Sequence, residues 1–161
     1  MNFAIRKITP MLTRTTSTHP DFLALVARLD AELAERDGDD HAFYAQFNKT
    51  VQLNEVVVAY EDGVPVACGA LRVFAPRVME VKRMYTLPKY RGRGIAARVL
   101  TELEAWAGEL SCEKCILETG KRQPEAIALY EKNGYRSIPN YGQYGTVDNS
   151  VCFEKVIGKK V

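Results

Sequence analysis

The stretch that most constrains the fold runs from Met79 to Ala96 and reads M-E-V-K-R-M-Y-T-L-P-K-Y-R-G-R-G-I-A. Its first part alternates in polarity as a half-buried strand does. One side would carry Val81, Arg83, Tyr85 and Leu87, and the other Glu80, Lys82, Met84 and Thr86. Pro88 ends the alternation and a helical pattern follows Gly94, so the stretch predicts a strand, a turn and the start of a helix.

The turn contains Arg91, Gly92, Arg93 and Gly94. Glycines leave backbone N–H groups open, and the start of a helix carries a partial positive charge. Such a turn is typical of a phosphate site. Taken in isolation, the same glycines could merely permit a left-handed turn beside solvated arginines.

One known motif with this spacing is the dinucleotide fingerprint, because Gly92-x-Gly94-x-x-Ala97 fits it and the acids Glu113 and Glu118 follow at roughly 20 residues. That fingerprint adjoins the first strand of a repeated β-α-β fold. Here Pro88 to Arg91 separate strand from glycines. A nicotinamide-dependent oxidoreductase is therefore the weaker alternative.

The remaining patterns predict an α+β fold with a mixed sheet, in the order β-α-α-β-β-β-α-β-α-β-β. Thr18, followed by Asp21, is expected to cap the first helix, which would end near Gly38. The expected strands are 2–8, 56–60, 64–74, 78–87, 115–118, 135–138 and 150–157, with a loop at 9–18. The other expected helices are a short one carrying Phe43, Tyr44 and Phe47, a long one over 94–108 that buries Ile95, Val99, Leu103 and Trp106, and one from Pro124 to Asn133.

Two separated segments resemble the GNAT superfamily of acyl-CoA-dependent N-acetyltransferases. Arg91-x-x-Gly94-x-Ala96 is similar to its Arg/Gln-x-x-Gly-x-Gly/Ala turn, and the segment from Ala126 to Tyr135 is similar to its A-x-x-L-Y-x-x-x-G-F/Y motif. The resemblance covers nearly the whole chain, 1–161, as one domain. It implies a mostly antiparallel sheet with a parallel, splayed central pair.

By this resemblance, the chain would transfer the acetyl group of acetyl-CoA to a primary amine by direct attack in a ternary complex. The pyrophosphate would lie on the N–H groups of Arg93, Gly94, Ile95 and Ala96, with charge from Arg91 or Arg93. The pantetheine arm would follow Met84, Tyr85 and Thr86, and Gln123 would either bind its amide or simply begin a helix. A non-catalytic acyl-CoA sensor is the other alternative.

The resemblance also suggests catalytic residues. Glu80 is the candidate base, although an ordinary cross-strand contact with Lys82 or Arg72 explains it equally well. Tyr130 is the candidate acid that protonates the departing thiolate, against a plain role in the core. The acceptor would enter near 36–41 and 139–149. The acids Asp37, Asp39 and Asp40 could attract an amine there or merely cap helices, and Tyr141 and Tyr144 could form a lid or only a hairpin.

The composition limits the partners. Lys and Arg total 22 against 20 Asp and Glu, so the basic excess typical of nucleic-acid binding is missing. Without a long apolar run or a signal-peptide core, we expect a cytoplasmic protein with no membrane contact. Family members are often dimers, so a homodimer is an open expectation. The four cysteines, Cys68, Cys112, Cys115 and Cys152, lack partners at zinc-ligand spacing, so we expect no metal and buried thiols.

Overall fold

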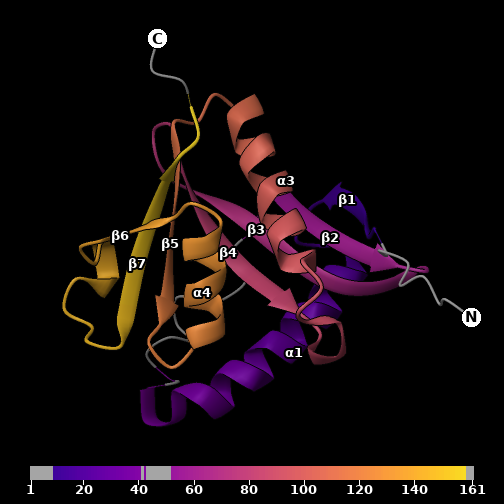
Figure 1. Ribbon diagram of the computed structural model, residues 1–161, viewed down its shortest axis with the longest axis horizontal. Helices are drawn as coiled ribbons and strands as arrows, with labels where there is room; N and C mark the ends of the chain where they lie inside the picture. Colours follow the sequence, from indigo (N-terminus) through magenta and orange to yellow (C-terminus); the bar gives the residue numbers. More distant parts are fainter. Residues whose placement is uncertain (1–8, 41, 43–51, 159–161) are drawn as a thin grey trace, which may run out of the picture.

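A computed structural model of the chain describes residues 9–40, 42 and 52–158. The described part contains a seven-stranded sheet in the order β1-β2-β3-β4-β5-β7-β6, flanked by helices (Figure 1). The strands are β1 (Met11–Thr15), β2 (Glu55–Glu61), β3 (Val64–Ala75), β4 (Val78–Thr86), β5 (Lys114–Gly120), β6 (Arg136–Ile138) and β7 (Ser150–Val156). The helices are α1 (Pro20–Asp37), α3 (Ile95–Glu109) and α4 (Pro124–Lys132), with short 3-10 turns at Gly38–Asp40, Pro88–Tyr90 and Gly142–Tyr144.

The mixed sheet is confirmed, as is the expected element order for α1 and from β2 onward, and the N-terminal region differs. Strand β1 occupies residues expected to form a loop, and it pairs antiparallel with β2. Its polar sequence concealed it: Leu12 packs on the core while Arg14 reaches across to Glu102 and Glu109 on α3. The strand expected at 2–8 and the helix expected around Phe43 lie outside the described residues.

The N-cap of helix α1 lies one residue later than expected. The Asp21 N–H donates to Nδ1 of His19 at 3.1 Å, so His19 caps the helix. Thr18, the expected cap, instead has its hydroxyl 3.0 Å from that of Thr16. The helix ends at Gly38 as predicted, since that glycine adopts φ +53°.

Two apolar layers lie on opposite faces of the sheet. Helix α1 packs Phe22 and Leu25 against β2, β3 and β4 on one face. Helices α3 and α4 cover the other face, where the expected core residues Ile95, Val99 and Leu103 are fully buried (Figure 1). Trp106 is only half-buried, and the guanidinium of Arg14 lies 4.8 Å above its ring.

The parallel, splayed central pair is confirmed. Strands β4 and β5 pair only where Val78–Glu80 face Lys114–Ile116. Beyond Glu80 the two strands separate toward α1 (Figure 1). The gap leaves the far half of β4 without a neighbouring strand on that side. All other pairings in the described sheet are antiparallel.

A bulge in β4 overturns part of the expected alternation. Arg83 adopts φ +59°, and the register with β3 shifts between Cys68 and Ala70. Val81 therefore packs in the α3 layer and Tyr85 in the α1 layer, although the sequence pattern placed them on one side. The pattern assumed an unbroken period of two, which an extra residue interrupts.

Gly69 lies opposite this bulge, where a side chain has no room. A Cβ atom there would come within 2.4 Å of the Met84 sulfur and 2.9 Å of Leu103 Cδ1. The missing side chain lets Met84 lie between β3 and α3. No sequence pattern indicated that Gly69 has this role.

Candidate functional site

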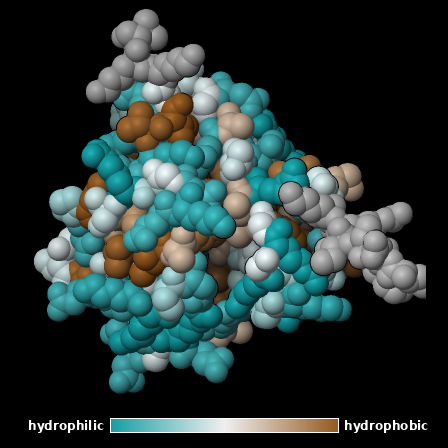
Figure 2. Space-filling view, viewed as in Figure 1, coloured by the Kyte–Doolittle hydropathy of each residue, from teal (hydrophilic) through white to brown (hydrophobic). Residues whose placement is uncertain are grey.

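A cavity of about 400 Å³, called here the outer cavity, lies where β4 and β5 separate. Elements α1, β4, α3 and α4 all contribute to its walls. In the space-filling view, apolar side chains gather in a recess between α4 and the start of α3, bordered by polar ones (Figure 2). The apolar lining consists of Leu29, Leu33, Met84, Ile95, Ala96, Ala97, Ala126 and Leu129. A cavity of this size and character is typical of a small-molecule site.

The glycine turn lies at one end of the outer cavity. Gly92 and Gly94 have φ of +78° and +79°, a conformation that other residues adopt only with strain. A Cβ on either glycine would meet nothing within 4 Å, so backbone conformation and not space requires them. Gly94 is the N-cap of α3, and no side chain caps the helix. The first N–H groups of α3 therefore have no intrahelical partner and lie at the cavity wall.

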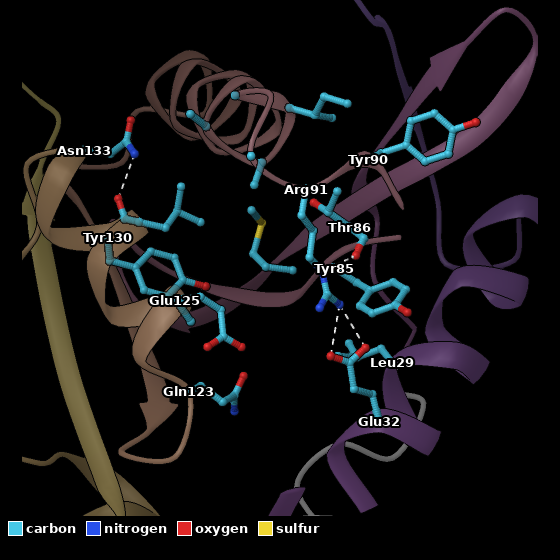
Figure 3. A pocket seen from close by; sticks show the side chains of 18 of the residues that line it. Leu29, Glu32, Tyr85, Thr86, Tyr90, Arg91, Gln123, Glu125, Tyr130 and Asn133 are labelled. Atoms are coloured by element: carbon cyan, nitrogen blue, oxygen red, sulfur yellow. Dashed lines mark hydrogen bonds and ion pairs between the residues drawn. The ribbon is translucent and has the colours of Figure 1, made fainter. Parts of the chain in front are cut away.

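The two arginines of the turn differ in position. Arg91 lines the cavity, where its guanidinium donates to both carboxylate oxygens of Glu32 at 2.9 and 3.0 Å and to the Thr86 carbonyl at 2.9 Å (Figure 3). Arg93 is not among the lining residues. Its guanidinium lies 5.4 Å from the Tyr90 ring and 3.7 Å from Glu61. Of the two, only Arg91 is placed to add charge inside the cavity.

Three predicted residues on β4 line the cavity floor. Met84, Tyr85 and Thr86 lie beyond the last residue of β4 that pairs with β5. Backbone groups on this edge have no strand beside them and can accept an extended, peptide-like ligand. Tyr85 is nearly buried, and burial together with the neighbouring Glu32 raises the pKa of its hydroxyl.

Tyr130 lies at the end of the outer cavity away from the glycine turn. It comes from α4, and its hydroxyl points into the cavity (Figure 3). Only 6% of the residue is exposed, so its ring also packs in the core, at 5.8 Å from the Tyr135 ring. Burial, with a smaller effect of the Glu118 charge, raises its pKa. The hydroxyl therefore stays protonated at neutral pH and can donate a proton.

Gln123 occupies the N-cap position of α4, but its side chain does not cap the helix. The side chain points into the outer cavity (Figure 3). Beside it, Glu125 forms an ion pair with Arg36 of α1, and Arg36 also contacts Glu32 at 3.1 Å. These charges connect α1 to α4 across the cavity.

Glu80 lies apart from the residues above. It is 3% exposed, and the hydroxyl of Tyr141 donates to its carboxylate at 2.6 Å. It lines neither the outer cavity nor the smaller pocket described below. No ion pair joins it to Lys82 or Arg72 among the described residues. Tyr144 is 1% exposed and packs on Cys152, so it belongs to a small core and not to a lid.

A second, smaller space continues from the outer cavity behind Tyr130. This inner pocket has a volume of about 110 Å³ and shares Met84, Gln123 and Tyr130 with the outer cavity. Its charged lining consists of Asp37, Lys82, Arg83 and Glu118. Of the three acids expected near the acceptor, only Asp37 reaches it; Asp40 contacts Arg122 at 3.4 Å.

From the sequence, Glu118 was expected only as an acid of the dinucleotide pattern, and Lys82 and Arg83 had no expected part in the site. Nothing in the local sequence could have joined residues 37, 82 and 118, because they meet only once β4 and β5 separate.

The described residues contain no group of three His, Cys, Asp or Glu side chains arranged to hold a metal ion. The four cysteines are free and buried, as predicted. Burial raises the pKa of the Cys68 and Cys115 thiols to about 12. Within the described ranges, no helix has the length and apolar character needed to cross a membrane.

Residues 21–135 match the family model described as Acetyltransferase (GNAT) family. An IAA acetyltransferase from Azospirillum brasilense is 37% identical over 100 residues, which cover 62% of this chain and 65% of that protein. The uncharacterized N-acetyltransferase YjgM of Escherichia coli is 39% identical over 61 residues, which cover 38% of this chain and 36% of that protein. The chain thus spans less than two thirds of the length of these curated relatives.

Solved structures share the fold more fully. A Klebsiella pneumoniae protein assigned as an acyl-CoA N-acyltransferase has a TM-score of 0.79 and 30% identity, covering 94% of this chain and 99% of its own. The PaiA N-acetyltransferase of Thermoplasma acidophilum, solved in complex with coenzyme A, has a TM-score of 0.64 and 16% identity over 92% of this chain and 99% of its own. At 16% identity the likeness concerns the fold alone.

Proposed function

Since the chain belongs to the acetyltransferase (GNAT) family, we propose that it transfers the acetyl group of acetyl-CoA to a primary amine by direct attack within a ternary complex. The observation that carries this proposal is the continuous path of the outer cavity. It runs from the backbone amides at Gly94 and Ile95, along the unpaired edge of β4, to the hydroxyl of Tyr130.

The residues of this path fit coenzyme A. Backbone N–H groups at the start of α3 would bind the pyrophosphate, and the two positive-φ glycines keep side chains away from it. Arg91 would add positive charge, held in place by Glu32. The edge of β4 from Met84 to Thr86 would pair with the amide groups of the pantetheine arm, and Gln123 would donate to one of them.

The residues at the far end fit the chemistry. Acetyl-CoA supplies the acetyl group as a thioester. A backbone N–H near Met84 or Tyr85 would stabilise the charge that develops on the thioester oxygen. Tyr130 would donate its proton to the departing sulfur, since its hydroxyl points into this end of the outer cavity. The assignment of Glu80 as the base stays a prediction.

The proposal is tested with purified protein, acetyl-CoA and a panel of amines comprising ethanolamine, propylamine, glycinamide, tyramine, spermidine and Nα-acetyl-lysine amide. We expect acetyl-CoA at 100 times its Kd to raise Tm by about 5–10 °C. We also expect at least one amine to release free thiol and to gain an acetyl group by mass.

Binding of acetyl-CoA without acetylation of any amine would instead support a sensor. Stabilisation by NAD without stabilisation by acetyl-CoA would contradict the proposal, and it is the outcome that a dinucleotide site predicts.

A further inference from the structure

The inner pocket is too small to hold more than the end of a ligand. Its volume of about 110 Å³ is below the ~150 Å³ of a cavity that holds benzene. It opens onto the outer cavity at Tyr130, the proposed acid, and Met84, part of the proposed pantetheine site. A ligand group lying in it would approach the reacting end of the outer cavity from the opposite side.

Two carboxylates from the central strands lie near this junction, and only one of these two lines the inner pocket. Glu80 pairs in register with Ile116, so Glu118 lies two residues further along β5 on the same face of the sheet. Glu80 is covered by Tyr141 and lines neither space. Glu118 is half-buried and lines the inner pocket. A ligand in the inner pocket could therefore contact the carboxylate of Glu118 but not that of Glu80.

Arg83 supplies a second, independent sign of a ligand in the inner pocket. Its side chain is 8% exposed, and its Nη2 donates to Asp30 at 2.7 Å. Its Nη1 is buried and makes no hydrogen bond within the described part of the chain. Buried donors are nearly always satisfied in folded proteins. Because Arg83 lines the inner pocket, an oxygen atom of a ligand there would satisfy it.

We propose that the inner pocket binds the reacting end of the acceptor, an amine that carries an oxygen atom a few bonds away, with Glu118 as the base and Arg83 Nη1 as the donor to that oxygen. This inference rests on the proposed function and adds to it the catalytic base and the acceptor class.

The charges around the inner pocket favour a cation. The charge of Lys82 interacts with the carboxylates of Glu80 and Glu118, and Arg83 forms an ion pair with Asp30. Asp37 adds a third carboxylate to the inner pocket, near Glu118. Burial lowers the pKa of Lys82; the charges of Glu80 and Glu118 oppose this shift, and those of Arg72 and Arg83 add to it. An ammonium group on the acceptor would offset the excess of carboxylates.

The pKa of Glu118 suits a base at neutral pH. Burial is the main cause that raises it, a hydrogen bond with Ser150 and the charge of Lys82 lower it, and Glu80 and Asp37 raise it again. The result is a pKa of about 7. A base whose pKa lies near the working pH accepts a proton readily and still occurs in its charged form.

The proposed acetyl transfer moves protons as follows and changes no oxidation state. Glu118 takes one proton from the ammonium group and later passes it to solvent. The neutral amine attacks the thioester carbon, the C–N bond forms and the C–S bond breaks. Tyr130 gives its proton to the sulfur and recovers one from the nitrogen, which is positively charged after attack. The products are the amide and the free thiol.

The first test compares Glu118→Gln with the matched control Glu80→Gln, using every panel amine that the wild type acetylates. We expect kcat/KM of the wild type to rise with pH through about 7, because the charged form of Glu118 is required. Glu118→Gln should lower kcat/KM about 100-fold and remove this rise, while the Kd for acetyl-CoA stays the same. Glu80→Gln should keep the rise.

A rise near pH 7 that survives in Glu118→Gln, or that disappears in Glu80→Gln alone, overturns the assignment of the base while the proposed function stands. Absence of turnover in the wild type with every amine overturns both. Should Glu118→Gln not fold, Lys82→Met gives an independent test. It removes a charge that lowers the pKa of Glu118, so the rise must move to higher pH, and an unmoved rise overturns the assignment.

The second test addresses Arg83 with two amines of equal size, ethanolamine and propylamine. We expect the wild type to favour ethanolamine in kcat/KM by about 10-fold, since only that amine offers an oxygen to Nη1. Arg83→Met should bring the ratio near one. Equal use of the two amines by the wild type, or use of neither, overturns the acceptor class.

Discussion

The outer cavity and the inner pocket meet at Met84 and Tyr130, yet different kinds of group form their walls. The outer cavity offers main-chain amides, an open strand edge and many apolar side chains, together with charged side chains that pair with one another, such as Arg91 and Glu32. The inner pocket offers four charged side chains, Asp37, Lys82, Arg83 and Glu118, from three separate elements. One space is defined by backbone conformation and the other by which charges the fold brings together.

This difference separates two sources of specificity. A site formed by the main chain tolerates many side chains, because the glycine turn and the strand edge present the same N–H and C=O groups whatever surrounds them. A site formed by side chains changes with every substitution at its few charged positions. Under the proposed function, the outer cavity would keep its cofactor while the inner pocket changed its acceptor.

Tyr130→Phe tests whether the two spaces meet at the reacting atoms. Loss of the hydroxyl should lower kcat by about 100-fold or more, because a general acid contributes that much, and should leave the Kd for acetyl-CoA unchanged. Tyr135→Phe is the matched control. Its hydroxyl donates to Glu104 at 2.9 Å and it lines neither space, so kcat should stay within about threefold. Equal losses in both variants would contradict the assignment.

The pH dependence of the free energy of unfolding of Glu118→Gln tests how much burying the charged carboxylate of Glu118 destabilises the fold. The pKa of Glu118 is raised from 4.5 to about 7 on folding. As pH rises, the unfolded chain therefore loses this proton first, and the folded state loses stability between about 4.5 and 7. The variant lacks this loss, so its advantage in free energy of unfolding should grow to about 2–3 kcal/mol by pH 8.

Denaturant unfolding at several pH values between 4 and 8 measures this advantage. Glu113→Gln, an exposed carboxylate at the start of β5, should show no such growth. An advantage for Glu118→Gln that does not change with pH would mean that Glu118 keeps its ordinary pKa.

Gly69→Ala tests how closely the outer cavity depends on packing behind β4. The added methyl group would lie 2.4 Å from the Met84 sulfur, so Met84 must move toward the cavity. We expect a loss of about 1–2 kcal/mol in the free energy of unfolding and weaker binding of acetyl-CoA.

The control is Gly120→Ala on β5, where the nearest atom would lie at an ordinary 3.5 Å. Its stability, measured by the same unfolding experiment, should change by less than about 0.5 kcal/mol. An unchanged Kd for acetyl-CoA in Gly69→Ala would show that Met84 does not border the ligand.

Gly94→Ala tests whether the backbone conformation of the glycine turn matters for binding in the outer cavity. At φ +79° an alanine costs about 1–2 kcal/mol, so the turn should relax and acetyl-CoA should bind about 10-fold more weakly by calorimetry. Gly108→Ala, within α3, should instead raise stability by about 0.5–1 kcal/mol with no change in binding. Unchanged binding of acetyl-CoA by Gly94→Ala would contradict the proposed role of this turn in binding the pyrophosphate.

The sequence predicted the outer cavity better than the inner pocket for a physical reason. The glycine turn, Tyr130 and the strand ahead of them lie in continuous segments, where local patterns report on structure. Glu118 and Asp37 acquire their surroundings only through the tertiary fold. So does the contact of Tyr141 with Glu80, which joins residues 61 positions apart.

Within the continuous segments, the missed features were those that break a period. Arg83 carries no sign of its positive φ, since arginine rarely adopts it. Gly69 sits in a strand whose neighbours are small and apolar, so nothing local showed that Met84 would need its space. Strand β1 was missed because it is short and mostly polar, so its sequence resembles that of a loop.

Because of the bulge at Arg83, β4 should tolerate the deletion of a residue less well than the replacement of one. Deleting Met84 would move the later residues of β4 to the opposite side of the sheet, so Tyr85 would leave the α1 layer and enter the α3 layer. Point substitutions in the inner pocket carry no such penalty. Divergence of this chain from its relatives should therefore proceed by replacing charges at fixed strand length, so that acceptor preference changes while the backbone frame is preserved.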